Sequence, residues 1–292
     1  MQWRREMKLE NAIEVRNLCK RYPGFALEDV NFTLPSGCVL GLVGENGAGK
    51  STIINLLMNA IRRDNGEVRV LGTDPMDPCF IRTKQEIGVV LDEAHFPELL
   101  TATDVGKMMQ SCYANWDASL YRAYLARFDL PERKSFKDYS RGMRMKLAIA
   151  VALSHGARLL ILDEATGGLD PMARDEMLDI LNDFTREENH SILISSHIVS
   201  DLEKICDSIA FVHKGRMLFC EEKDKLMEEY ALLKLSKADF EAVPPEAVVS
   251  LRENPYGVEV LVRRAMVNEA LTPERATLEE IILFFVKGAD AR

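Results

Sequence analysis

The sequence predicts an α/β protein with a doubly wound core, and two observations carry that prediction. The first is a set of continuous apolar runs of strand length, typical of strands covered on both faces of a parallel sheet, at residues 38–43, 87–91, 159–162 and 191–194. The second is a set of helical stretches that alternate with these runs, at residues 52–61, 171–187 and 198–206. Strands that alternate with helices predict a parallel sheet with helices on its faces.

Other regions precede and interrupt this core. Residues 13–18 and 25–34 alternate apolar and polar side chains, which predicts half-buried strands ahead of the first glycine-rich loop. Between about residues 92 and 156 the apolar positions recur at helical spacing, in the stretches 104–113, 119–128 and 143–154. We interpret this region as a helical subdomain inserted into the sheet domain.

The C-terminal part of the chain predicts a small α+β appendage. A charged helix at residues 221–230 is followed by two strand-like runs, at 232–236 and 258–263. The final helix opens with Thr277 and Glu280, whose spacing is that of a capping box. We therefore divide the chain into residues 12–222 and 223–292. The appendage carries no chemical motif, so regulation, support of a dimer and simple packing all stay open.

Composition and charge narrow the function classes. The chain has 37 Lys and Arg against 46 Asp and Glu, a net charge of −9, so the basic surface expected for nucleic-acid binding is missing. Its cysteines form no Cys-x-x-Cys pair and residues 1–21 show no secretory leader, which favours a reduced, cytosolic compartment. The longest apolar runs, such as residues 281–286, fall short of a membrane span. A role at a membrane would require a separate subunit.

The glycine-rich loop from Gly44 to Ser51 reads Gly-x-x-x-x-Gly-Lys-Ser and joins a buried strand to a helix. Its glycines let backbone amides face phosphate oxygens, and the helix N-terminus favours the same negative charge. Lys50 would reach the β- and γ-phosphates, and the Ser51 hydroxyl would bind Mg²⁺. The alternative is a strand-to-helix turn without a ligand. The residues predicted to bind the triphosphate are Gly44, Asn46, Gly47, Ala48, Gly49, Lys50, Ser51 and Thr52.

A pair of acids follows the apolar run at residues 159–162. Asp163 stands at the carboxyl end of the predicted strand, where ligands bind in open α/β sheets, and would hold Mg²⁺. Glu164 follows it and is placed to polarise a water molecule in line with the γ-phosphate. On its own such a pair would be a solvated strand end or a helix cap. Together with the phosphate loop it indicates a nucleotide hydrolase.

A further motif makes the chain resemble the ATP-binding cassette (ABC) family. Tyr139-Ser140-Arg141-Gly142-Met143 lies directly before a helix and ahead of the acidic strand, where this family carries the signature Leu-Ser-Gly-Gly-Gln. Ser140 and Gly142 are retained and would contact a γ-phosphate, while the other three residues depart from the pattern. The alternative for an isolated Ser-x-Gly is a simple helix cap.

The resemblance covers about residues 12–220 and assigns further residues. Residues 167–170 resemble the D-loop, His197 resembles the switch histidine that contacts the γ-phosphate, and Tyr22 matches the aromatic residue on which adenine stacks. The family's glutamine is replaced by Asp92, followed by Glu93, and the Asp92 carboxylate can still supply an oxygen to Mg²⁺. Without the resemblance, His197 would be a structural histidine and Tyr22 a core or surface residue.

The resemblance also implies the fold, the cofactors and the partners. It implies a P-loop NTPase (RecA-like) core with an antiparallel β subdomain, which binds ATP and Mg²⁺ and hydrolyses ATP. Two cassettes, identical or different, pair head to tail, so ATP held by Lys50 and Ser51 of one is completed by Ser140 and Gly142 of the other. The receiver is a separate transmembrane permease on the cytoplasmic face of the cell membrane.

The candidates for the groove that grips the permease are Phe96, Pro97, Leu99 and Leu100, with packing inside the helical subdomain as the alternative. The residues 115–117 and 130–131, with the methionine of the signature, look most like bacterial cassettes of the drug and peptide exporter branch. A soluble cassette acting on ribosomes or DNA would have two cassettes in one chain or a long coiled-coil insert, together with basic patches, and the sequence shows none of these. Retention of the catalytic motifs argues against a regulatory cassette that binds ATP without hydrolysing it.

Overall fold

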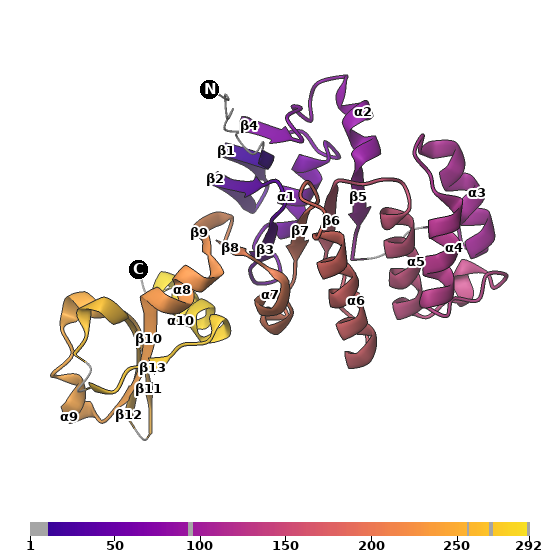
Figure 1. The fold of residues 1–292 in the computed structure, drawn as a ribbon. Coiled ribbons are helices and arrows are strands. Elements are labelled where there is room, and N and C mark those ends of the chain that lie inside the picture. Colours follow the sequence, from indigo (N-terminus) through magenta and orange to yellow (C-terminus); the bar gives the residue numbers. More distant parts are fainter. Residues whose placement is uncertain (1–10, 93–95, 256, 269–270, 291–292) are drawn as a thin grey trace, which may run out of the picture.

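A computed structural model describes residues 11–92, 96–255, 257–268 and 271–290 of the chain. Its strands form three sheets, of three, four and six strands. Figure 1 shows the largest sheet at the centre, the helical subdomain on one side of it and the C-terminal appendage on the other. The predicted division into a core, an inserted helical region and an appendage therefore describes the arrangement of the elements.

The central sheet holds the strands that position the candidate site. In chain order these strands are β3 (Val39–Val43), β5 (Ile87–Val90), β6 (Leu159–Asp163), β7 (Ser191–Ser195), β8 (Ser208–His213) and β9 (Arg216–Glu222). Their spatial order is β5-β6-β7-β3-β8-β9, and all neighbours are parallel except β8 and β9. Every residue of β3, β6 and β7 is buried, as the continuous apolar runs predict. The helices that accompany this sheet are α1 (Lys50–Leu57), α6 (Pro171–Phe184) and α7 (Val199–Ile205).

A smaller antiparallel sheet lies beside the core. It consists of β1 (Asn11–Tyr22), β2 (Phe25–Pro35) and β4 (Asn65–Val70), in the order β2-β1-β4. The alternating pattern of residues 25–34 matches the burial of β2, whose apolar side chains at Leu27, Val30, Phe32 and Leu34 all point into the core. The short helix α2 (Phe80–Thr83) follows this sheet.

The helical subdomain is present in the predicted region. Its helices are α3 (Ala102–Cys112), α4 (Ala118–Arg127) and α5 (Arg141–Leu153). Helix α5 packs closely on β5 at Gly88, where an added Cβ would lie 2.8 Å from the Ala152 carbonyl oxygen. Only glycine fits that approach, so Gly88 fixes the subdomain against the sheet.

The appendage is an α+β unit with one sheet. Its elements are α8 (Lys223–Glu229), β10 (Tyr230–Leu235), α9 (Lys237–Phe240), β11 (Val248–Asn254), β12 (Gly257–Arg263), β13 (Glu274–Arg275) and α10 (Leu278–Asp290). The capping box predicted before α10 is formed, since the Thr277 amide and hydroxyl donate to the Glu280 carboxylate and the Glu280 amide donates to the Thr277 hydroxyl. Phe285 of α10 packs on Phe219 of β9, with ring centroids 5.1 Å apart, and joins the appendage to the core.

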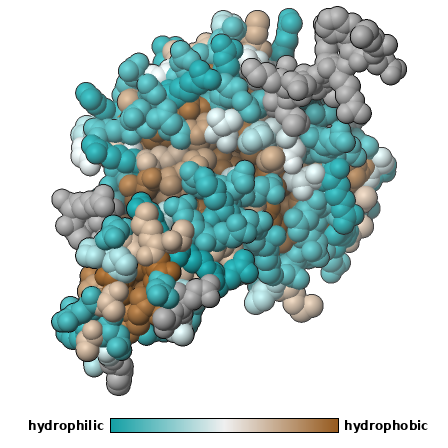
Figure 2. Space-filling model, turned by 60° about the vertical axis from the view of Figure 1, so that its left-hand side comes forward, coloured by the Kyte–Doolittle hydropathy of each residue, from teal (hydrophilic) through white to brown (hydrophobic). Residues whose placement is uncertain are grey.

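The surface differs between these parts. Figure 2 shows a mostly hydrophilic face over the core, with hydrophobic residues gathered on the appendage at the lower left. Among the large apolar side chains of the appendage, Leu251 and Leu283 are 43% and 52% exposed. The described residues contain no helix long and apolar enough to cross a membrane.

Candidate nucleotide site

The predicted phosphate loop wraps around the side chain of Lys50. The Lys50 ammonium group is buried and donates to the Gly44 carbonyl oxygen at 2.7 Å and to the Glu45 carbonyl oxygen at 3.4 Å. Gly47 and Gly49 have φ angles of +81° and +116°, a backbone conformation that favours glycine. The loop therefore takes its shape from its own sequence, and it holds a positive charge at the N-terminus of α1.

A cavity of about 470 Å³ opens above this loop. Its lining residues are Phe25, Glu45, Asn46, Gly47, Gly49, Lys50, Ser51, Thr52, Asp92 and Glu164. Gly44 and Ala48 are buried in the loop and do not line the cavity. The cavity thus brings together most of the residues predicted to bind the triphosphate, two of the predicted metal ligands, Ser51 and Asp92, and the predicted base, whereas Asp163 does not line it.

Asp163 is fixed by a residue that the sequence analysis did not select. The Ser195 hydroxyl of β7 donates to an Asp163 carboxylate oxygen, and both residues are buried. The same hydroxyl accepts a hydrogen bond of 3.1 Å from the Glu164 amide. Asp163 and Ser195 face each other in the parallel register of β6 and β7. Ser195 therefore positions both acids.

The Glu164 carboxylate lies between two basic groups. One oxygen is 3.5 Å from the Lys50 ammonium nitrogen and the other is 2.5 Å from His197 Nδ1. The first of these oxygens is buried without a hydrogen-bond donor. The His197 side chain is 60% exposed, so the pair stands at the rim of the site. This contact favours a functional interpretation of His197 over a role in the core.

The predicted metal ligands offer the donor types that Mg²⁺ prefers. Ser51, Asp92 and Asp163 supply oxygen atoms only, and Mg²⁺ is typically held by one or two carboxylates together with substrate phosphates and water. Among the described residues no group of three or more His, Cys, Asp and Glu side chains forms a metal site. The donor set therefore fits a metal ion that arrives with a phosphate ligand. Glu93 lies outside the described residues.

The signature residues do not line this cavity. The Ser140 hydroxyl caps α5, accepting a hydrogen bond of 3.2 Å from the Met143 amide, and Ser140 is exposed. Ser140 therefore acts as a helix cap, and the free amides of the first turn of α5 lie at the surface beside it. Arg141, between Ser140 and Gly142, forms an ion pair with Asp92, with Nη2 and Oδ1 2.7 Å apart.

The structure adds an aromatic residue next to the predicted adenine platform. Tyr22 ends β1, is 41% exposed and lies with its ring 5.4 Å from the Lys20 ammonium nitrogen. It is paired in register with Phe25 of β2, and Phe25, rather than Tyr22, lines the cavity. A Cβ on Gly49 would come within 3.0 Å of the Phe25 ring. Stacking of adenine on Tyr22 stays a prediction, and Phe25 is a second candidate for that contact.

The segment that resembles the D-loop has a structural role in this subunit. Asp170 caps α6, because its carboxylate accepts hydrogen bonds from the Ala173 and Met172 amides at 3.0 and 3.1 Å. These amides hold the pKa of Asp170 below its usual range. Leu169 is buried. The segment therefore ends in the N-terminal cap of α6.

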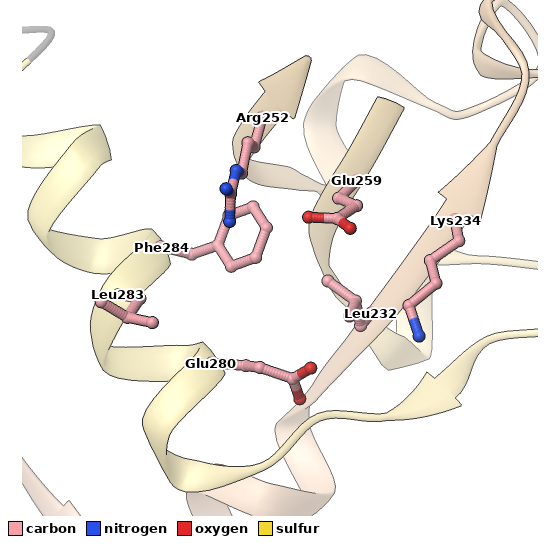
Figure 3. Close-up of a pocket in the computed structure, with 7 residues that line it drawn as sticks. All are labelled: Leu232, Lys234, Arg252, Glu259, Glu280, Leu283 and Phe284. Atoms are coloured by element: carbon pink, nitrogen blue, oxygen red, sulfur yellow. The ribbon is translucent and has the colours of Figure 1, made fainter. Parts of the chain in front are cut away.

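The appendage contains a second cavity, of about 260 Å³, between α10 and its sheet (Figure 3). Its lining residues are Leu232, Lys234, Arg252, Glu259, Glu280, Leu283 and Phe284. Lys234 is paired with Glu274 at 2.6 Å, and Glu280 belongs to the capping box of α10. Arg252 and Glu259 face each other in the register of β11 and β12. These pairings account for its charges within the fold.

The core sheet, the phosphate loop and the two acids define a P-loop nucleotide hydrolase. Comparison with known proteins gives the family. The ABC transporter family model matches residues 27–167. The lantibiotic transport ATP-binding protein SrtF of Streptococcus pyogenes is 33% identical over 217 residues, covering 73% of this chain and 91% of the relative. The bacitracin transport ATP-binding protein BcrA of Enterococcus faecalis is 33% identical over 215 residues, covering 73% and 70%.

Solved structures agree with this result. A structure of the ATP-binding subunit of an ABC transporter superposes with a TM-score of 0.67 at 26% identity, covering 74% of this chain and 91% of that one. A dimeric cassette bound to ADP and Pi has a TM-score of 0.64 at 20% identity, which shows the fold alone. The chain belongs to the ABC transporter family and is its ATP-binding, ATP-hydrolysing subunit. The resemblance inferred from the sequence is confirmed.

Proposed function

We propose that this subunit hydrolyses ATP with Mg²⁺ in a head-to-tail pair of cassettes and thereby drives a separate permease that exports its cargo. The observation that carries the proposal is the position of Glu164. Its carboxylate enters the phosphate cavity from one side, with the Lys50 ammonium group 3.5 Å away and His197 at 2.5 Å. These contacts are the ones expected of a base that accepts the proton of an attacking water molecule.

The residues of this chain divide the work. Lys50 and the amides of the phosphate loop bind and orient the β- and γ-phosphates, where a buried positive charge is most effective. Glu164 takes up the proton of the water at its carboxylate, and His197 orients that carboxylate. Ser51, Asp92 and Asp163 would hold Mg²⁺, which when bound neutralises charge on the phosphate oxygens. Tyr22, with Phe25 beside it, would stack on the adenine.

The head-to-tail pairing is supported by the absence of the signature residues from the lining of the cavity. Ser140 and Gly142 are not among its lining residues, while Ser140 is exposed at the N-terminus of α5. A helix N-terminus favours phosphate, so this end of α5 suits the triphosphate of a second cassette. In a two-fold pair each subunit then completes the site of the other.

The permease contact is proposed around the segment after Asp92. Leu99 is 75% exposed and Pro97 is exposed, as a docking surface requires. Phe96 and Leu100 are partly buried, and the Phe96 ring packs edge to face on Phe136, with centroids 5.5 Å apart. We therefore assign Leu99 and Pro97 to the contact and Phe96 and Leu100 to its support. The permease would hold the subunit at the cytoplasmic face of the membrane.

The names of the relatives suggest the kind of cargo. Two of them are named as lantibiotic transport and bacitracin transport ATP-binding proteins. We propose export of a peptide or peptide-like compound, recognised by the permease. A gene for a protein with about six membrane spans next to the gene of this chain would support the proposal. A solitary gene would speak against it.

The test of the site uses two substitutions in the full chain. Glu164→Gln keeps the shape of the side chain and removes the base, so ATP turnover should fall about 10²- to 10⁴-fold. ATP binding should persist, and a dimer trapped by ATP should appear in light scattering. Lys50→Ala should abolish ATP binding measured with a fluorescent analogue. Glu86→Gln, a substitution at the opposite end of β5, is the control and should leave both measurements unchanged.

Each result can contradict a separate part of the proposal. If Glu164→Gln hydrolyses ATP at the rate of the unmodified chain, Glu164 is not the base. If Lys50→Ala binds ATP with unchanged affinity, the cavity above the phosphate loop is not the triphosphate site.

A further inference from the structure

An ion pair between Asp92 and Arg141 connects the edge of the nucleotide cavity to the helical subdomain. Asp92 follows β5 and lines the phosphate cavity, whereas Arg141 is the first residue of α5. The guanidinium Nη2 lies 2.7 Å from Asp92 Oδ1. The side chain of Arg141 also crosses Gly168, where an added Cβ would lie 3.0 Å from its Cδ and 3.1 Å from its Nε. This path holds the guanidinium at the edge of the cavity.

The two residues depart from the family pattern in a complementary way. Asp92 stands where the resemblance places glutamine, and Arg141 stands where it places glycine. A glutamine forms no ion pair, and a glycine has no side chain to offer one. The two departures together create a charge pair that the usual residues would not form, and this pair involves a carboxylate of the nucleotide cavity.

We propose that Arg141 competes with the divalent metal ion for Asp92, so that this ion pair sets how tightly the cavity takes up its metal. The proposal rests on the proposed function, in which Asp92 is one of the metal's oxygen donors. A carboxylate within 2.7 Å of a guanidinium is already neutralised, and a second cation at the same carboxylate is repelled by the first. Metal uptake therefore releases Arg141 from Asp92.

The size of the effect follows from exposure. The Asp92 and Arg141 side chains are 51% and 61% exposed, so solvent screens their interaction. An exposed pair of this kind changes an equilibrium about two- to fivefold. Release of Arg141 also frees the N-terminus of α5, where Ser140 and Gly142 flank Arg141. A metal ion bound at Asp92 would thus affect Ser140 and Gly142, the residues proposed to contact the triphosphate of the second cassette.

The test measures metal binding directly. The full chain with a non-hydrolysable ATP analogue is titrated with Mn²⁺, and free Mn²⁺ is followed by its paramagnetic resonance signal. Arg141→Met removes the charge and should lower the Mn²⁺ dissociation constant about two- to fivefold. Arg141→Lys keeps the charge and should behave like the unmodified chain. An unchanged or raised constant for Arg141→Met overturns the proposal.

The matched control is Arg158→Met. Arg158 forms a comparable ion pair with Glu86, at 2.9 Å, with side chains 45% and 40% exposed. That pair lies at the other ends of β5 and β6, so its loss should leave the Mn²⁺ constant unchanged. If Arg158→Met lowers the Mn²⁺ dissociation constant as much as Arg141→Met does, the change in net charge alone explains the effect and the proposal is overturned.

A double-mutant cycle separates competition from nearby charge. In an Asp92→Asn chain, Ser51 and Asp163 remain for the metal, and Arg141→Met should have no further effect. The same gain in both backgrounds would overturn the proposal, because Arg141 would then act on the metal without Asp92. An unmodified chain that binds the ATP analogue but no Mn²⁺ contradicts the proposed metal site itself. Mn²⁺ binding without any effect of Arg141 contradicts only the competition.

Discussion

Ser195→Ala is the most informative single substitution in the core of the site, because Ser195 positions both acids without contacting the nucleotide cavity. Its hydroxyl donates to the buried Asp163 carboxylate and accepts from the Glu164 amide at 3.1 Å. The amide also donates to the Ser195 carbonyl oxygen at 3.1 Å, a bond that alanine retains. The substitution therefore mainly removes the hydrogen bond to the Asp163 carboxylate.

The expected change in the free energy of unfolding follows from the loss of this hydrogen bond. A hydrogen bond to a charged group contributes about 1.5–3 kcal/mol to stability, and the Asp163 carboxylate has little access to replacement water, being 5% exposed. Ser195→Ala should lower the free energy of unfolding of the full chain by about 1.5–3 kcal/mol, measured by urea denaturation. It should also weaken Mn²⁺ binding in the presence of an ATP analogue, since Asp163 is then free to turn.

Ser191 supplies the matched control on the same strand. It is fully buried, and its hydroxyl accepts a hydrogen bond of 2.9 Å from the neutral Gly37 amide. Ser191→Ala should cost about 0.5–1.5 kcal/mol, with no change in metal binding. If Ser195→Ala costs no more than Ser191→Ala, the Asp163 carboxylate does not depend on Ser195 and the reasoning is refuted.

Three further substitutions test the fold. Gly88→Ala places a methyl group 2.6 Å from a Leu160 methyl carbon, so overpacking should cost about 1–3 kcal/mol in urea denaturation; a neutral result would show that α5 can move off β5. Thr277→Ala removes the cap of α10 and should cost about 0.5–2 kcal/mol, and rescue by Thr277→Ser would assign the loss to the hydroxyl. The Arg63 guanidinium holds the pKa of Asp74 below its usual range, so the stabilisation is present at neutral pH and is lost as pH falls through the folded pKa. The destabilisation caused by Asp74→Asn should therefore shrink below about pH 4, and a constant difference would contradict the shift.

The parts of the site that were predicted from the sequence are local. The phosphate loop is contiguous and the acids directly follow a strand. The local sequence therefore identifies these residues and also their position relative to the strand and the helix. Ser195 was missed because its contact depends on β7 lying beside β6, which only the strand order reveals. Arg141 was read as a departure from the signature, and helices α3 and α4 separate it in the chain from its partner Asp92.

The missed strands have two different causes. The apolar run of β8, Ser208–His213, resembles those of the other core strands, so its signal was present in the sequence. β9, β4 and β11 are exposed along much of their length and mix charged with apolar residues, so their pattern is weak. Phe25 begins a predicted strand, but only the approach of Gly49 to its ring shows that it reaches the cavity. Such a contact follows from tertiary packing.

The backbone at Glu164 explains how one residue faces both Lys50 and His197. Glu164 has a φ of +51°, a left-handed conformation that costs a non-glycine residue about 1–3 kcal/mol. The Glu164 amide donates to Ser195, and the Gly167 amide donates to the Glu164 carbonyl oxygen at 2.9 Å, so the turn is held from both sides. The strain is therefore offset by neighbours that the strand order supplies. Because the turn directs the carboxylate into the cavity, relaxing it would withdraw the base from the phosphates while leaving the sequence motif unchanged.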